Sequence, residues 1–347
     1  MSARRPAALV ATLALLLVAV PAGPAAAHAI GTGTESSNYR TGIRVIDQGT
    51  PGISVRTVAG EQLELTNRSP KEVVVLGYRM EPYLRVGPAG VFENQRSPST
   101  YTNRFRTAPA EIPPEFDAKA IPAWRRIGDG PSVAWHDHRA HWTGPDPSAV
   151  KASPGVPHVV VPDWRIPLEQ DGLTMIIRGN ITWVPGPSPW PWALTAVALF
   201  AAALAAAGGY RRPRVLGVVA LVAVAADMVH TAGALLASTA PVATEVYGTV
   251  TSAAGWVITG LAAWRLLRGR GESAAVYLLL GGVLLTLAGA LPDLGALARS
   301  ELPSAVGPTV TRAAIAVTLG LGAAMVVAGL LGFRSGDGQR EAGSPAS

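Results

Sequence analysis

Two hydrophobic patterns divide this chain into a β-rich half and a helical half. Between residues 43 and 184, short apolar runs rich in Val, Ile, Tyr and Trp are separated by Gly, Pro and Asn. This alternation is typical of short strands joined by turns. After residue 193, five apolar stretches follow, each long enough to cross a membrane as a helix. The sequence therefore predicts an all-β sandwich domain followed by an all-α transmembrane bundle of five helices.

The strands of the β-rich half are predicted from apolar runs that lie between turn residues. Residues 62–65 and 73–78 flank the turn-rich segment 67–71, which indicates a hairpin. Residues 107–122 are rich in proline and mixed in charge, so we expect an ordered loop over the sandwich. Later strands are expected at residues 132–136, 158–161 and 173–184.

The five apolar stretches of the helical half contain 18 to 23 residues. At 1.5 Å per residue, helices of this length cross a hydrocarbon layer of roughly 30 Å. A hinge is expected at residues 186–192, because its prolines disfavour helix and strand and its tryptophans suit the headgroup layer. The predicted helices lie at residues 193–210, 215–236, 242–264, 274–291 and 313–333, within a membrane domain at 193–333.

The N-terminal residues 1–27 have the pattern of a secretory signal peptide. Arg4 and Arg5 precede an apolar stretch, and three alanines at 25–27 form a cleavage site. Cleavage there makes His28 the first mature residue and defines an extracytoplasmic domain at 28–185. An alternative small-residue site around His28 would remove this histidine.

The arginines of the helical half predict the orientation. They lie in the loop after the first stretch, in the loop after the third and just beyond the fifth, and such clusters mark the cytoplasmic side. We therefore expect a multi-pass protein of the cell membrane, with the β-domain outside and a disordered cytoplasmic tail at 334–347. The arginines are Arg211, Arg212, Arg214, Arg265, Arg268, Arg270 and Arg334.

Composition narrows the chemistry. The chain is 49% hydrophobic and only 15% charged, which is too apolar for an ordinary soluble protein. Its net charge is +6, yet residues 28–189 hold 17 Lys and Arg against 16 Asp and Glu, so no nucleic-acid partner is indicated. Without cysteine there is no disulfide and no thiolate site. A bound metal would need His, carboxylate, Met or amine ligands.

Three of the six histidines fall within the segment Trp135–Trp142, whose sequence is WHDHRAHW. If the segment begins as a strand, His136 and His138 lie on one face, and His141 on the next turn can approach them. Converging imidazoles suit Cu(II) or Zn(II). The alternative is a rigid polar plug in which the histidines bind carboxylates and backbone.

A mature N-terminal His28 offers an α-amine and an imidazole, which together chelate copper in the arrangement called a histidine brace. The alternative is a frayed terminus without a ligand role. With His136, His138 and His141, His28 completes the predicted metal ligands, for copper in the first place and zinc in the second.

Charged and aromatic residues alternate in the segment 77–94. They suggest a ligand cleft with Glu81, Tyr83 and Arg85 as polar contacts and Met80 as a soft ligand. An ion-paired edge strand with its turn explains the same residues.

Ionisable residues in a membrane helix are costly and often functional. Asp227 and His230 lie three residues apart on one face of the second predicted helix, so we expect an intramembrane polar site facing the bundle interior. The third or fourth helix should supply their neighbours. A hydrogen-bonded staple between helices is the alternative. Glu245 and Asp293 lie near outer helix ends, where water makes them less informative.

The segment 77–94, the segment 135–142 and the N-terminal His-Ala resemble an uncharacterised family of bacterial exported membrane proteins with GYxxEPYLRVGPxGVxEN and WHDHRxHW motifs. This resemblance covers most of residues 28–185 and implies no established activity. A β-domain with a mature N-terminal histidine joined to a helical bundle is also similar to copper-resistance proteins of the CopC and CopD type. Neither half shows their full motifs, and five helices are fewer than theirs.

No catalytic signature is present, since the chain lacks G-x-S-x-G, a Walker loop, H-E-x-x-H and a cysteine nucleophile. A metal-dependent surface enzyme is therefore the third hypothesis. The first is a membrane-anchored, extracytoplasmic protein with a cupredoxin-like or Ig-like sandwich that handles copper, with a metal-trafficking or envelope protein as partner. The second is an envelope adhesion or assembly module that binds a protein or glycan without metal.

Overall fold

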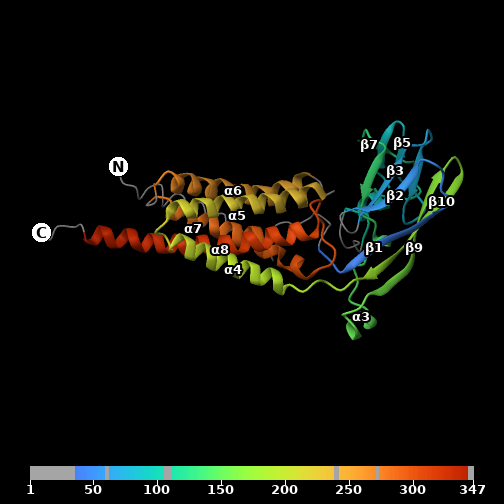
Figure 1. The fold of residues 1–347 in the computed structure, drawn as a ribbon. Coiled ribbons are helices and arrows are strands. Elements are labelled where there is room, and N and C mark those ends of the chain that lie inside the picture. Colours follow the sequence, from blue (N-terminus) through green and yellow to red (C-terminus); the bar gives the residue numbers. More distant parts are fainter. Residues whose placement is uncertain (1–35, 59–61, 105–110, 238–241, 271–272, 343–347) are drawn as a thin grey trace.

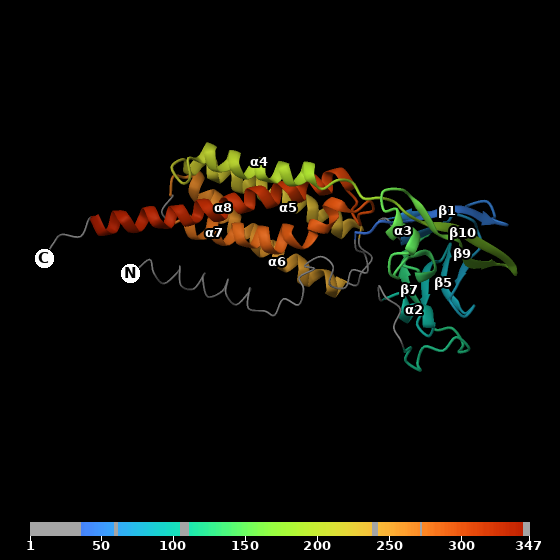
Figure 2. The ribbon, with the colours of Figure 1, turned by 90° about the horizontal axis from the view of Figure 1, so that it is seen from below.

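The computed structural model describes residues 36–58, 62–104, 111–237, 242–270 and 273–342. A β-rich domain lies at one end of a helical bundle, and the helices run side by side along a common axis (Figures 1 and 2). An antiparallel β-region followed by five long apolar helices confirms the coarse prediction. The predicted signal peptide and His28 lie outside the described residues.

The strands of the β-rich domain form two sheets in which every neighbouring pair is antiparallel. The larger sheet has the order β1-β10-β9-β4-β5-β6-β7, and the smaller has the order β2-β3-β8. The strands are β1 Tyr39–Asp47, β2 Ile53–Val58, β3 Gln62–Asn67, β4 Val73–Leu76, β5 Pro82–Gly87, β6 Gly90–Asn94, β7 Trp124–Gly128, β8 Ser132–Trp135, β9 His158–Gln170 and β10 Leu173–Trp183. Short helices α2 Pro98–Thr102 and α3 Ser148–Ala152 lie in the connections.

Both sheets contribute to one hydrophobic core. Leu63 and Leu65 of β3 are fully buried in the same cluster as Val75, Leu84 and Ile166 of the larger sheet. Burying an aliphatic side chain of this size contributes roughly 1.5–3 kcal/mol before the entropy of ordering is counted. The apolar runs recognised in the sequence therefore supply the core of the domain.

The predicted hairpin between residues 62–65 and 73–78 is wrong. β3 pairs with β2 and β8, whereas β4 pairs with β5 and β9, so the turn connects two sheets. Asn67 holds this crossing, because its side chain donates to the carbonyls of Lys71 at 2.7 Å and Val86 at 2.9 Å. The turn residues were recognised correctly, but pairing depends on contacts with distant strands.

Among the residues that the structure describes, five helices have the length and composition of membrane spans, as predicted. α4 already begins at Trp190, within the predicted hinge, because proline is tolerated in the first turn of a helix. The predicted tail begins inside α8, which extends beyond its neighbours at the end away from the β-rich domain (Figure 1). The helices are α4 Trp190–Ala207, α5 Pro213–Ala237, α6 Val242–Leu267, α7 Ala275–Leu284 and α8 Pro308–Ala342.

The fourth span is not a regular α-helix. After α7, it continues as a π-helix, η2 Leu285–Ala290, and then as a 3₁₀ helix, η3 Leu291–Ala298. Pro292 lies at the start of η3, where it cannot donate the hydrogen bond that would continue a regular helix. From Leu285 onward, this span therefore departs from the geometry expected of a simple membrane helix.

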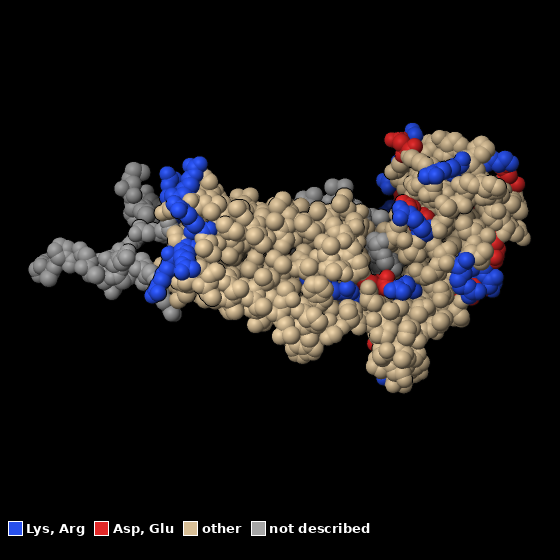
Figure 3. Space-filling model, in the orientation of Figure 1, with Lys and Arg blue, Asp and Glu red and all other residues tan. Residues whose placement is uncertain are grey.

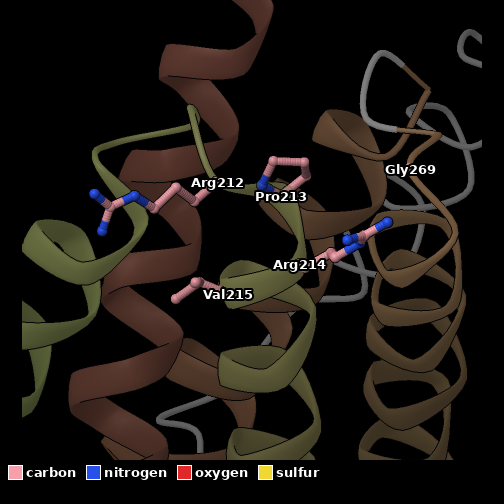
Figure 4. A pocket seen from close by; sticks show the side chains of 5 residues that line it. All are labelled: Arg212, Pro213, Arg214, Val215 and Gly269. Atoms are coloured by element: carbon pink, nitrogen blue, oxygen red, sulfur yellow. The ribbon is translucent and has the colours of Figure 1, made fainter.

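Positive charge gathers at the end of the bundle farthest from the β-rich domain (Figure 3). The loop between α4 and α5 and the segment after α6 supply it, as the arginine pattern predicts. A shallow pocket of about 410 Å³ at this end is lined by Arg212, Arg214 and Gly269, with Pro213 and Val215. The two arginine side chains point away from each other in this pocket (Figure 4).

Candidate functional site

The segment Trp135–Trp142 leaves the smaller sheet and turns sharply. β8 ends at Trp135, and a single 3₁₀ turn, η1, covers His138–Ala140. Asp137 caps this turn, because its side chain accepts a hydrogen bond from the backbone N–H of Arg139 at 3.0 Å. The assigned strand ends before His136, but the backbone of Asp137 between His136 and His138 is still extended, with φ −136° and ψ 118°.

The three imidazoles of this segment are nevertheless neighbours. The ring centroid of His136 lies 5.0 Å from that of His138 and 4.7 Å from that of His141. Both contacts are edge-to-face, and His136 and His141 are buried. His138 lies with its Nε2 atom 3.3 Å from the carbonyl oxygen of Thr102. We call these three side chains the histidine cluster.

The histidine cluster is not a preformed metal centre. Within the described part of the chain, no group of three or more His, Cys, Asp or Glu side chains is arranged so that it could hold a metal ion. A copper site would therefore need a further ligand or a rearrangement of these rings. The predicted fourth ligand, His28, lies outside the described residues.

Asp137 anchors the segment from within. It is completely buried and accepts hydrogen bonds from Trp135 Nε1 at 3.1 Å and from Arg139 Nε and Nη2 at 2.9 and 2.8 Å. Burial alone would raise the pKa of the Asp137 carboxyl, but the Arg139 guanidinium and these hydrogen bonds lower it below its ordinary value. The carboxylate is therefore ionised at neutral pH and fixes both neighbouring side chains.

Arg139 and Tyr78 join the histidine cluster to the segment that follows β4. The Arg139 guanidinium donates to the carbonyls of Leu76 at 3.1 Å and Gly77 at 3.3 Å, and it lies 4.8 Å from the Tyr78 ring centre. The Tyr78 hydroxyl accepts from the backbone N–H of His138 at 2.9 Å and donates to Asn103. The two motifs singled out in the sequence therefore form one contiguous structure.

β1 lies against the other side of the segment. The Thr41 hydroxyl donates to the carbonyl of Ala140, and the Tyr39 ring centre lies 5.9 Å from that of Trp142. Thr41 is buried, so this contact belongs to the interior of the domain. β1 and the histidine segment are thus packed together.

Glu81, predicted to line a cleft, is buried and stabilises a turn by hydrogen bonds. Its carboxylate accepts from the hydroxyls of Ser97 at 2.8 Å and Ser99 at 2.7 Å, and from the backbone N–H of Arg79 at 2.9 Å. Burial raises the pKa of Glu81, but the hydrogen bonds from Ser99 and Ser97 outweigh it, so the pKa is lowered overall. These bonds tie the turn after β4 to the N-terminus of α2.

The other three predicted cleft residues have different surroundings. Tyr83 is buried in the core, whereas Met80 is 60% exposed on a turn with a positive φ of 63°. The Arg85 guanidinium lies 4.5 Å from the Phe92 ring centre and 4.9 Å from that of Trp124. Contacts within the fold thus account for Tyr83 and Arg85, and the ligand cleft stays a prediction.

Asp227 and His230 face the interior of the bundle, as predicted, with only 1% and 6% of their surface exposed. Trp256 Nε1 of α6 donates to Asp227 Oδ2 at 2.7 Å. His230 Nε2 lies 2.9 Å from Asp293 Oδ2 of η3. The predicted third and fourth spans therefore supply the neighbours of both residues.

The contact of Asp293 with His230 and the role of Trp256 were not predicted from the sequence. Asp293 was expected to be accessible to water near the end of its helix, but the irregular η2 and η3 segments bring it to His230. The spacing of residues in a regular helix gives no signal for such a rearrangement. Trp256 resembles any other apolar residue of its helix until its partner is known.

We expect the β-rich domain to lose stability in acid. The pKa values of Glu81 and Asp137 lie below their ordinary values of 4.5 and 3.8. A carboxyl with a lowered folded-state pKa contributes stability that is present above the unfolded pKa and is lost as pH falls through the folded pKa. In urea unfolding of the detergent-solubilised chain, the transition of the β-rich domain should therefore move to lower urea concentration below about pH 4.5. An unchanged transition midpoint between about pH 6 and about pH 3 would contradict this account.

Comparisons with protein-family models, curated proteins and solved structures find no significant match to this chain. The functional conclusion therefore depends on the geometry above.

Proposed function

We propose that this chain is a membrane-anchored, extracytoplasmic protein whose β-rich domain binds copper through His28 and the histidine cluster. The supporting observation is the contact of the His136 ring with those of His138 and His141, at centroid distances of 5.0 and 4.7 Å. This contact places imidazole nitrogens within one small region of a chain that has no cysteine. Nitrogen-rich ligand sets favour Cu(II) over the other divalent first-row ions, with Zn(II) as the alternative.

His28 supplies what the histidine cluster lacks. The cluster by itself does not form a three-ligand metal group, whereas an N-terminal histidine adds an amine and an imidazole. His28 precedes Ser36 by eight residues, which reach up to about 28 Å when extended. β1 follows directly and packs through Thr41 against Ala140, so this reach includes the histidine cluster.

The biological role that follows is copper handling or copper resistance at the cell membrane. In this role, the domain captures the ion outside the cell and passes it to a metal-trafficking or envelope partner. The cupredoxin-like or Ig-like sandwich belongs to this proposal, and two antiparallel sheets around one core are compatible with it.

The orientation is part of the same proposal, with the β-rich domain outside and the C-terminus in the cytoplasm. It is supported by the arginines at the far end of the bundle (Figure 3). A C-terminal reporter that works only in the cytoplasm should be active, and one that works only outside the cell should be inactive. The opposite result would contradict the proposed orientation.

A second function has its own support. Asp137, Arg139 and Trp135 form a buried hydrogen-bonded network that anchors the histidine segment from within. Such a plug suits an envelope adhesion or assembly module that presents a fixed surface to a protein or glycan partner. Metal binding by the purified protein distinguishes the two functions.

Cu(II) titration of the purified mature chain tests the copper proposal. His136→Ala and His141→Ala should each weaken binding by about 10-fold or more, because each substitution removes an imidazole that either binds the ion or positions a neighbouring ligand. His158→Ala is the matched control, since His158 contacts the Ser153 carbonyl at 2.8 Å, away from the histidine cluster. Binding should also weaken in acid, where imidazole and amine are protonated. Equal affinity in all four proteins would leave the partner-binding function in place.

A further inference from the structure

Six arginines supply the positive charge at the end of the bundle farthest from the β-rich domain (Figure 3). They belong to two connections that lie side by side, because one pocket is lined by Arg212 and Arg214 from the first and by Gly269 from the second (Figure 4). Five of the six are exposed, and Arg265 is half-buried. We call this group the arginine collar, which consists of Arg211, Arg212, Arg214, Arg265, Arg268 and Arg270.

The arginine collar has little negative charge to balance it. Among the residues that the structure describes, none of its arginines forms an ion pair with a carboxylate. Residues 204–226 and 257–271 contain no Asp or Glu, and Glu272 lies outside the described residues. Residues 334–342 of α8 hold two arginines and two acids, which cancel. Even with Glu272 ionised, the collar therefore leaves a net charge of +5 at this end.

Aromatic rings hold several of these arginines in place. The guanidinium carbons of Arg268 and Arg270 lie 4.9 and 5.6 Å from the centre of the Trp264 ring. That of Arg265 lies 4.7 Å from the Tyr277 ring centre. Such contacts position a guanidinium without cancelling its charge. They use its flat face and leave N–H donors at its edge, which match the oxygens of a phosphate group in pairs.

Below the arginine collar, α5 and α6 present exposed apolar stripes of the kind that lipid acyl chains cover. Each stripe follows the spacing of one helix face and has an arginine at its head. The two helices are in close contact, because a Cβ atom at Gly217 of α5 would lie 2.8 Å from Leu267 Cγ of α6. The stripes are Arg214, Val218, Leu221 and Val222 on α5, and Arg268, Trp264, Leu261 and Val257 on α6.

We propose that the arginine collar binds the headgroups of anionic phospholipids in the bilayer leaflet at its end of the bundle. The position of the collar supports this occupant, since apolar spans long enough to cross the bilayer end at these arginines, which places them at headgroup level. Basic pockets between membrane helices recognise anionic headgroups by their charge. Phosphatidylcholine also carries a phosphate, but its ammonium group cancels the charge. The collar therefore prefers a lipid with a net negative charge, and this inference is independent of copper binding.

Electron paramagnetic resonance of spin-labelled lipids tests the headgroup preference. The full-length chain is reconstituted in phosphatidylcholine vesicles that contain a small fraction of phosphatidylglycerol, with the label on an acyl chain of one lipid or the other. We expect the fraction of label immobilised by the protein to be about 2-fold larger or more for phosphatidylglycerol, because nearby arginines attract an anionic headgroup. Equal immobilised fractions of the two lipids would overturn the proposal.

Arg214→Gln combined with Arg268→Gln should remove most of this preference, because these arginines head the two stripes. Neither side chain donates a hydrogen bond within the part of the chain that the structure describes, so the bundle should stay folded. Arg68→Gln combined with Lys71→Gln is the matched control. It removes the same charge from the β-rich domain, where Lys71 pairs with Asp171 at 2.6 Å. A preference that persists in the collar variant, or that falls equally in the control, would overturn the collar as the binding site.

The wild type tests the identity of the occupant without any substitution. Added sodium chloride should reduce the preference for phosphatidylglycerol, because salt screens charges at the bilayer surface. Sodium phosphate at the same ionic strength should reduce it equally. A larger loss in phosphate would mean that a soluble phosphate group takes the arginines in preference to lipid, which would overturn the lipid as occupant. A preference unaffected by either salt would overturn the arginine charge as its cause.

Discussion

Replacing Asp137 with alanine is expected to lower the unfolding free energy of the β-rich domain by about 3–5 kcal/mol. The change removes the acceptor of Trp135 and leaves the Arg139 guanidinium, only 19% exposed, without its carboxylate partner. An uncompensated buried charge is among the most destabilising changes a domain can suffer. Urea unfolding of the detergent-solubilised chain, followed in the β-rich domain, measures the loss.

Asp129→Ala is the matched control for this variant. Asp129 also pairs with an arginine, Arg126, at 2.8 Å, but its side chain is 88% exposed. Exposed ion pairs contribute about 0–1 kcal/mol, so this variant should remain near the wild type. If both aspartate variants cost the same, the buried network is not what holds the histidine segment.

Gly179→Ala should destabilise the same domain by roughly 3 kcal/mol, near the upper end for overpacked interiors. A Cβ atom at this position of β10 would lie 2.0 Å from the Gly42 carbonyl oxygen and 2.2 Å from the Trp164 ring. Gly179 is opposite Ile43 in the β1–β10 register, so relief of this clash must displace β1. Since β1 holds the histidine segment through Thr41, copper binding should weaken as well.

The glycine comparison is controlled by Gly155→Ala. No atom lies within 4 Å of a Cβ atom built at Gly155, so this variant should change stability by less than about 0.5 kcal/mol. Thermal unfolding of both variants against the wild type gives the answer. A tolerated alanine at position 179 would mean that β1 and β10 are not packed as closely as described.

Sequence patterns predicted those parts of the fold that depend on local spacing. Runs of 18 or more apolar residues identify membrane helices because the bilayer core sets their length, and all five appear. Strands near residues 62–65, 132–136 and 173–184 also followed from apolar runs and turn residues, whereas β1, β2 and β7 were not predicted and β9 extends to Gln170, beyond the expected 158–161. Pairing did not follow from the sequence, because the choice of β9 and β5 as partners of β4 depends on contacts between distant segments.

The candidate site shows the same division. The sequence placed His136, His138 and His141 together because they are close along the chain, and their rings do touch. The sequence did not predict that this turn is a 3₁₀ turn capped by Asp137. Asp293 was out of reach of sequence reasoning, because only the π-helical and 3₁₀ turns of its span bring it to His230.

Electron paramagnetic resonance of one equivalent of Cu(II) bound to the mature full-length chain tests the copper proposal most directly. The account predicts nitrogen couplings from imidazole and from the terminal amine. A chain extended by one residue before His28 should lose the coupling of the His28 amine while retaining imidazole, because the backbone nitrogen of His28 is then a peptide amide. His136→Ala should further reduce the imidazole couplings. A spectrum of aqueous copper in the mature wild-type chain, or identical spectra in all three proteins, would contradict copper binding through His28 and the histidine cluster.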